Sequence, residues 1–267
     1  MRTPLLLAML LYSLHAATPA TAGRRADLAV TPRATVADAA TGASGPRVLL
    51  DADFDDQPLD SPIGIGGPTL GQPVSIHPGL LAIVRDAPRP SPSLELAHDT
   101  PGLARTARFE FLESEEVMHG DVELRFVFRA EQLDFFSLVY VREQASSSRS
   151  FLTMSLHPSG AIHANDASGE PSIDVGSYLP GVDCEVHVTF HLDAGTWDLA
   201  IDDVPVVLGR PHGVEDRGIG GLLFGTDHQT QAGSLLYIDT LRVRRGDGIY
   251  ADGFEPGPGA GSPGAAR

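Results

Sequence analysis

The stretch from Cys184 to Val207 constrains the fold more than any other part of the chain. Apolar side chains occupy every second position up to residue 191, a turn follows at Asp193–Gly195, and the alternation then resumes. The apolar members of the pattern are Val186, Val188, Phe190, Trp197, Leu199 and Ile201. Period-2 alternation around turn residues is typical of half-buried strands in hairpins. We therefore predict three successive antiparallel strands with Trp197 and Cys184 in the core.

The rest of the chain repeats this pattern at short intervals, and no window of a dozen residues carries a convincing helical period. Strands are predicted at 47–54, 74–77, 80–84, 93–97, 104–112, 121–129, 135–143, 151–157, 161–164, 172–175, 183–192, 196–202, 204–208, 220–225 and 234–244. Many short strands separated by Gly- and Pro-rich turns indicate an all-β sandwich or barrel. A count above ten favours a two-sheet antiparallel jelly roll over a seven-strand immunoglobulin-like domain.

The chain resembles the laminin G-like, or concanavalin A-like, jelly-roll family between about residues 49 and 243. The residues that carry the resemblance are His187, Val188, Phe190, Leu199, Ile201 and Asp202 in the middle, Tyr237–Val243 at the end and Asp51–Asp55 at the start. Asp203 stands where the family usually has a turn glycine. The resemblance implies the fold far more than the activity, because this architecture carries lectin-like modules, adhesion domains and glycosidases alike.

Jelly rolls of this kind often hold a structural calcium ion near the paired terminal strands. Ca²⁺ takes several oxygen ligands, which clustered carboxylates provide. By resemblance, Asp53 or Asp55 would meet Asp239 at such a site. The alternative is an ordinary solvated strand end.

Composition divides the chain into four parts. Residues 1–22 have the form of a signal peptide, with Arg2, an apolar run and the cleavage motif Ala20–Ala22. Residues 23–46 are expected to be a flexible leader, 47–245 the jelly-roll domain and 246–267 a disordered tail that contains the apolar segment Ile249–Phe254. We expect a secreted or periplasmic protein. The absence of Lys beside abundant Ala, Gly and Pro is typical of a high-GC bacterial genome.

The formal net charge of −16 argues against nucleic acid and anionic membrane surfaces as partners. No segment after the signal peptide is apolar and long enough to insert in a membrane. Cys184 is the only cysteine, so no intramolecular disulfide forms.

Polar side chains of the central strands provide a candidate ligand-binding face. We predict that they share one outer, concave sheet surface, with Tyr140 as an aromatic platform for a sugar ring and the others as hydrogen-bonding groups. The predicted face comprises Arg125, Tyr140, Arg142, Thr153, His157, His187 and His191. The alternative is a solvated face, or one covered by a neighbouring segment.

Catalytic residues are not predicted. Glucanases of the related fold place acidic residues on one strand in a Glu-x-Asp-x-x-Glu pattern. The acidic residues here do not reproduce it: Glu113, Glu115, Glu116, Asp121 and Glu123. The sequence favours a non-catalytic module that binds carbohydrate or an extracellular polymer. Two alternatives remain open: a glycan-active hydrolase of the same fold, and an adhesion or structural domain with a protein partner.

Overall fold

The computed structural model describes residues 47–66, 71–98, 102–111, 116–143 and 150–246. All of them belong to one unit, residues 43–267. The predicted signal peptide, the leader, residues 247–267 of the predicted tail with Ile249–Phe254, and Glu113 and Glu115 lie outside the described residues, whereas Gly246, predicted to begin the tail, is the last residue of a strand. Among the described residues, no helix is long and apolar enough to cross a membrane.

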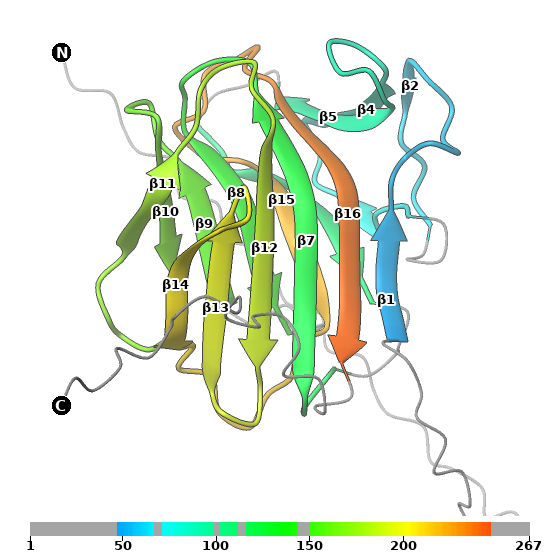
Figure 1. Cartoon of the computed structure of the whole chain (residues 1–267). Coiled ribbons are helices and arrows are strands. Elements are labelled where there is room, and N and C mark those ends of the chain that lie inside the picture. Colours follow the sequence, from blue (N-terminus) through cyan, green and yellow to red (C-terminus); the bar gives the residue numbers. More distant parts are fainter. Residues whose placement is uncertain (1–46, 67–70, 99–101, 112–115, 144–149, 247–267) are drawn as a thin grey trace, which may run out of the picture. The chain divides into compact units, whose positions relative to one another are not determined.

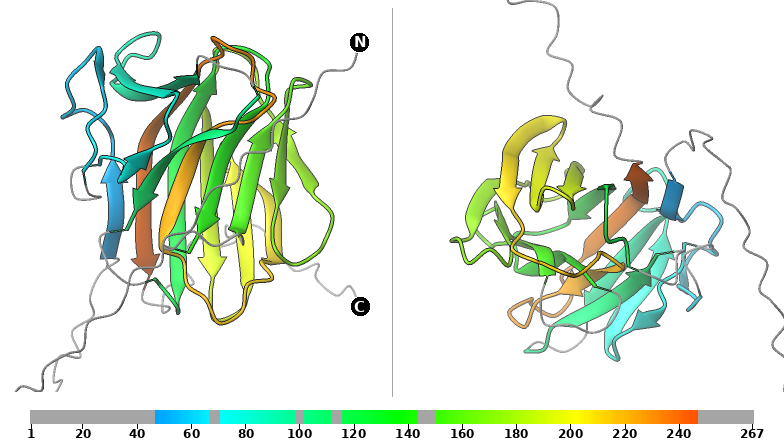
Figure 2. Two further views of the ribbon diagram at one scale, coloured as in Figure 1. Left: turned by 180° about the vertical axis from the view of Figure 1, so that it is seen from behind. Right: turned by 90° about the horizontal axis from the view of Figure 1, so that it is seen from below.

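The described residues form two antiparallel sheets packed face to face (Figures 1 and 2). The nine-stranded sheet, which faces the viewer in Figure 1, runs in the order β14 (Val204–Pro211), β13 (Thr196–Ile201), β12 (Cys184–His191), β7 (Asp121–Ala130), β16 (Leu236–Gly246), β5 (Ser93–His98), β4 (Leu80–Arg85) and β2 (Ser61–Pro62), with β1 (Arg47–Ala52) also paired to β16. The seven-stranded sheet runs in the order β11 (Ile173–Ser177), β10 (Ala161–Asn165), β9 (Ser150–Leu156), β8 (Phe136–Arg142), β15 (Gly221–Thr226), β6 (Arg105–Glu110) and β3 (Ser75–Ile76). The predicted two-sheet jelly roll is confirmed.

The core lies between the sheets and follows the alternation read from the sequence. In β12 every second side chain is buried, and Trp197 of β13 is completely buried. Phe126 of β7 packs edge-to-face on Phe224 of the opposite sheet, with ring centroids 5.1 Å apart. Burial raises the pKa of the Cys184 thiol to about 12, so this cysteine is a small core residue, as predicted.

The hairpin between β13 and β14 turns at Asp202 and Asp203. Both residues have positive φ, 49° and 61°, which is the combination that a two-residue type I′ hairpin requires. Asp tolerates this conformation better than most residues because its short polar side chain hydrogen-bonds locally. Here the Asp202 carboxylate accepts a hydrogen bond from the Glu185 backbone N–H at 2.8 Å. The turn therefore forms without the usual glycine.

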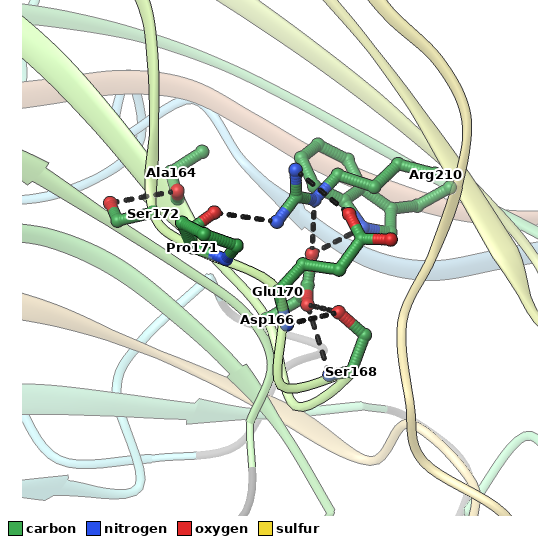
Figure 3. A network of polar contacts seen from close by, with 8 residues as sticks. Ala164, Asp166, Ser168, Glu170, Pro171, Ser172 and Arg210 are labelled. Carbon is green, nitrogen blue, oxygen red and sulfur yellow. Dashed lines mark hydrogen bonds and ion pairs between the residues drawn. The ribbon is translucent and has the colours of Figure 1, made fainter.

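A buried ionic network joins the two sheets beside β14 (Figure 3). The Arg210 guanidinium of β14 donates to Asp166, in the β10–β11 connection, at 2.6 Å and to the Pro171 carbonyl at 2.8 Å. Ser168 donates to the other Asp166 oxygen through its backbone N–H and its hydroxyl, and the Trp197 indole N–H lies 3.3 Å from the carboxylate. Because the Asp166 side chain is fully buried and satisfied from several sides, the network holds the layers in one arrangement.

Candidate functional site

The structure divides the predicted face between two sheets. Arg125, His187 and His191 lie on the outer face of the nine-stranded sheet, whereas Tyr140, Arg142, Thr153 and His157 lie on or directly after β8 and β9 of the seven-stranded sheet. The expectation of one shared surface is therefore wrong. The reason is that β12 pairs with β7, whereas β8 crosses to the opposite layer.

On the seven-stranded sheet, Tyr140 and Arg142 are engaged by neighbouring serines and by each other. The Tyr140 hydroxyl hydrogen-bonds to the Ser137 hydroxyl at 3.1 Å, and the Arg142 guanidinium lies 4.8 Å from the centre of the Tyr140 ring. Arg142 also donates to the Ser150 hydroxyl at 3.1 Å. Thr153 is half-buried directly opposite Tyr140. The ring predicted to be a sugar platform is thus covered in part by a cation from its own strand.

His157, just after β9, is enclosed in the same way. Its ring stacks on His163 with centroids 4.0 Å apart and contacts Phe135 edge-on at 5.1 Å. Burial lowers the pKa of His157, and the neighbouring His163 lowers it further. The imidazole is therefore neutral near pH 7 and belongs to a local ring cluster.

The nine-stranded sheet has a different arrangement on its outer face. Strand pairing places Arg242 of β16 directly opposite Arg125 of β7, and Arg125 directly opposite His187 of β12. Directly opposed side chains have Cβ atoms about 5 Å apart, and like charges in such positions destabilise a sheet. Two guanidinium groups and an imidazole therefore lie in one row across three strands.

A β-bulge in β16 directs the arginines outward. Between Asp239 and Arg242 the strand advances one residue more than β7, and Thr240 has a φ of 52°. This φ is rare for a β-branched residue. Beyond the bulge, Leu241 and Val243 are buried, while Arg242 and Arg244 project from the opposite face. Bulges often re-aim side chains next to functional sites.

Two adjoining depressions occupy this face. The larger, about 210 Å³, is lined by Glu123, Arg125, Arg242 and Arg244. The smaller, about 20 Å³, is lined by His187, Thr189, Asp198, Leu199, Ala200, Pro205 and Leu208. Their lining residues are strand partners across β7 and β12, where Glu123 is paired with Thr189 and Arg125 with His187.

Several polar groups here lack partners. Arg242 donates to Asp51 of β1 at 3.1 Å, but Arg125 makes no hydrogen bond or ion pair with any other described residue. Nε of Arg244 and Nε2 of His187 are buried without a hydrogen-bond partner in the described part of the chain. Burial lowers the pKa of His187, and the charge of Arg125 adds to this effect, so His187 is neutral near pH 7.

His191 lies on the same face but is fully engaged. Its ring nitrogens hydrogen-bond to Asp121 at 3.0 Å and to Asp198 at 3.2 Å. Burial alone would lower the pKa of His191, but the bonds to the two carboxylates outweigh it and raise the pKa. The ring is thus a bridge between β7 and β13 and is less available to a ligand than His187.

The residues of the predicted calcium site have other surroundings. Asp239 is buried and accepts hydrogen bonds from Arg89 at 2.9 Å and from the Ser91 hydroxyl at 3.0 Å. Asp53 and Asp55 are exposed. Within the described ranges no group of three or more His, Cys, Asp or Glu side chains is arranged to hold a metal ion. Calcium binding stays a prediction, and a lower melting temperature after chelation would support it.

Arg242 and Arg244 are the residues that the sequence reasoning missed. The alternation of Arg242, Val243 and Arg244 in the closing strand places both arginines on one face, and this signal was readable. What the sequence did not reveal is that β16 pairs with β7, which brings them beside Arg125.

Comparisons with known proteins support the fold. No protein-family model matches the sequence, and no curated protein matches it. Among solved structures, a sialidase superimposes with a TM-score of 0.55 at 13% identity over 76% of this chain, which spans only 19% of the sialidase. The catalytic domain of a glycoside hydrolase family 131 protein from Coprinopsis cinerea superimposes with a TM-score of 0.52 at 12% identity, over 75% of this chain and 95% of that domain. The chain is therefore similar to carbohydrate-active β-sandwich proteins in fold.

Proposed function

We propose that this protein is a secreted, non-catalytic module that binds carbohydrate on the outer face of its nine-stranded sheet. The observation that carries the proposal is the pair of adjoining depressions across β16, β7, β12, β13 and β14, where polar groups remain without partners. The likeness in fold to two carbohydrate-active proteins is consistent with this proposal.

The chemistry of the face suits a saccharide. A sugar presents hydroxyl groups to fixed donors and acceptors and apolar ring faces to apolar surface. Thr189 and Asp198 provide polar groups, and Pro205 with the exposed Leu208 provides apolar surface. Five adjacent strands span about 19 Å, which accommodates a short oligosaccharide lying across them. A rigid sheet also holds these groups in place before binding, which lowers the entropic cost of association.

A polysaccharide panel tests the proposal. Purified protein is incubated with soluble and insoluble polysaccharides, bound protein is measured, and the supernatants are assayed for new reducing ends. We expect retention on at least one polysaccharide without product. Released product would overturn the non-catalytic assignment, and retention on none would contradict glycan binding.

Two matched variants locate the site. His187→Ala alters the nine-stranded face, and Tyr140→Ala alters the seven-stranded face. We expect at least a tenfold loss of affinity for His187→Ala and little change for Tyr140→Ala. The reverse result would place the site on the seven-stranded sheet. Thermal unfolding of both variants controls for loss of the folded state.

A further inference from the structure

We propose that the depression between β7 and β16 binds an acidic group, a carboxylate or a sulfate ester, carried by the saccharide. This inference rests on the proposed glycan-binding function and specifies the class of its ligand. It predicts that acidic saccharides bind and that their neutral counterparts bind far more weakly.

The charge at this depression is opposite to that of the whole chain. The chain has 35 acidic and 19 basic residues, yet three of the four lining residues are arginines. The carboxylates at the same place are Glu123, which lines the depression, and Asp51, which pairs with Arg242. Three guanidinium groups thus face two carboxylates, and one positive charge is left without a counter-ion from these neighbours.

Two of the arginines have donors without a hydrogen-bond acceptor, although Arg244 is directly opposite Glu123 in the strand pairing. Arg125 has no hydrogen-bond or ion-pair partner among the described residues and is exposed. Arg244 has its Nε buried without an acceptor. A desolvated donor without an acceptor costs free energy, and a guanidinium group binds the two oxygens of a carboxylate or sulfate with a matching fork of N–H groups. An acidic ligand would supply the acceptors that these groups lack.

The lining residues also disfavour recognition by stacking. Neither described depression is lined by Phe, Tyr or Trp, so an aromatic platform for a neutral sugar ring is missing from this part of the molecule. Specific binding at the larger depression therefore has to come from charge and hydrogen bonds. That chemistry selects an acidic saccharide over a neutral one.

The same numbers argue against a nucleic acid as the ligand. Duplex DNA carries one negative charge per about 1.7 Å, and binding it depends on neutralising many phosphates. A chain with a net charge of −16 repels such a polyanion, and the depression offers only three arginines. A short saccharide with a few acidic groups carries far less charge than duplex DNA, so it is repelled less and needs fewer arginines.

The position of the depression gives the ligand a direction. The acidic group lies over β7 and β16, and the remainder extends across β12 toward β14. His187 lines the smaller depression and is paired with Arg125 of the larger one, and its buried Nε2 lacks a hydrogen-bond partner among the described residues, so a hydroxyl group that reached it would supply one. A neutral imidazole has one donor and one acceptor nitrogen, so it suits a hydroxyl group.

Paired saccharides test the inference by calorimetric titration at low ionic strength. The carboxylate arm compares trigalacturonate with its full methyl ester, and the sulfate arm compares a carrageenan oligosaccharide, in which sulfate esters are the acidic groups, with the same oligosaccharide after desulfation. We expect the acidic member of at least one pair to bind at least tenfold more tightly, and its affinity to fall as NaCl is added. Equal affinity within both pairs would overturn the inference.

Variants at the depression and away from it locate the effect. Arg125→Gln and Arg244→Gln are each expected to lower affinity for the acidic saccharide at least tenfold, and Arg125→Lys to restore only part of it, because an ammonium group lacks the planar fork. Arg217→Gln, an exposed loop substitution with the same change in net charge, is the matched control and is expected to bind normally. Unchanged binding in both test variants would overturn the inference.

The two proposals fail differently. Suppose that neutral polysaccharides bind, that His187→Ala abolishes this binding, and that acidic polysaccharides bind no better than neutral ones. The acidic site is then wrong, while the proposed glycan binding stands. If no saccharide binds, both proposals are contradicted.

Discussion

Arg210 and Arg125 are both on the nine-stranded sheet, and their surroundings are opposite. Arg210 is nearly buried, donates to a fully buried carboxylate and a carbonyl, and has Glu170 at 3.3 Å (Figure 3). Arg125 is exposed, lacks such partners among the described residues and lies opposite another arginine. The first arrangement holds two layers together. The second contributes nothing evident to the fold, and this contrast is the reason that we propose the larger depression as a ligand site.

Asp166→Ala is the most severe test of the first arrangement. The substitution leaves Arg210 largely buried without its carboxylate, and breaking such a pair typically costs about 3–5 kcal/mol of unfolding free energy. Chemical denaturation measures it. Glu170→Ala removes the exposed partner of the same arginine, and we expect it to cost less than about 1 kcal/mol. Equal losses for the two variants would contradict the distinction.

Thr240→Gly tests whether the bulge in β16, beside the Arg125–Arg242 pair, contains backbone strain. Holding a β-branched residue at a φ of 52° costs on the order of 1 kcal/mol, which glycine avoids. We expect the free energy of unfolding of the variant to rise by that amount, so that its midpoint moves to a higher denaturant concentration. A lower midpoint would mean that the bulge is not strained. Thr240→Ala, which keeps a Cβ, is the control.

His191 sharpens the comparison because it lies on the same outer face of the nine-stranded sheet as Arg125 but, like Arg210, is bound to carboxylates. Hydrogen bonds to Asp121 and Asp198 raise its folded-state pKa above the unfolded value of about 6.5. Its stabilisation is therefore complete below that value and lost as pH rises through the folded-state pKa. We expect the unfolding free energies of the wild type and of His191→Gln to differ by less than about 1 kcal/mol, because the site is half-exposed. This difference should be larger at pH 6 than at pH 9. A difference that widens with pH would refute this reading.

Arg125→Gln has the smallest expected effect on stability. Removing one of two opposed like charges at an exposed position raises the unfolding free energy by up to about 0.5 kcal/mol, and added salt reduces the gain. Thermal unfolding at low and high ionic strength measures both effects. A clear loss of stability would show that Arg125 has a structural role after all.

The sequence predicted most of the fold and part of the site, for one physical reason. Alternation along a strand is local, so every described strand except β2, the core position of Trp197 and the outward position of His187 were predicted and are confirmed. Strand β2, with only Ser61 and Pro62, is too short to alternate and was missed.

Pairing between distant strands is not local, and this is where prediction failed. Nothing in residues 135–157 indicates that β8 and β9 join the opposite sheet from β7, so Tyr140 was assigned to the wrong neighbours. Arg242 and Arg125 are far apart in sequence and meet only because β16 lies beside β7. The candidate depression is a product of sheet order, which one strand's pattern does not contain.

The bulge at Thr240 keeps the final strand in frame. Without the bulge, alternation would continue unbroken from Ile238 and would turn Leu241 and Val243 toward solvent. Arg242 and Arg244 would then point into the core. One extra residue would thus exchange the buried and exposed faces of the strand from that point on. The bulge absorbs that residue and leaves both halves in phase. Deleting Thr240 should therefore be tolerated, whereas deleting Leu241, which leaves Thr240 in its place, should not.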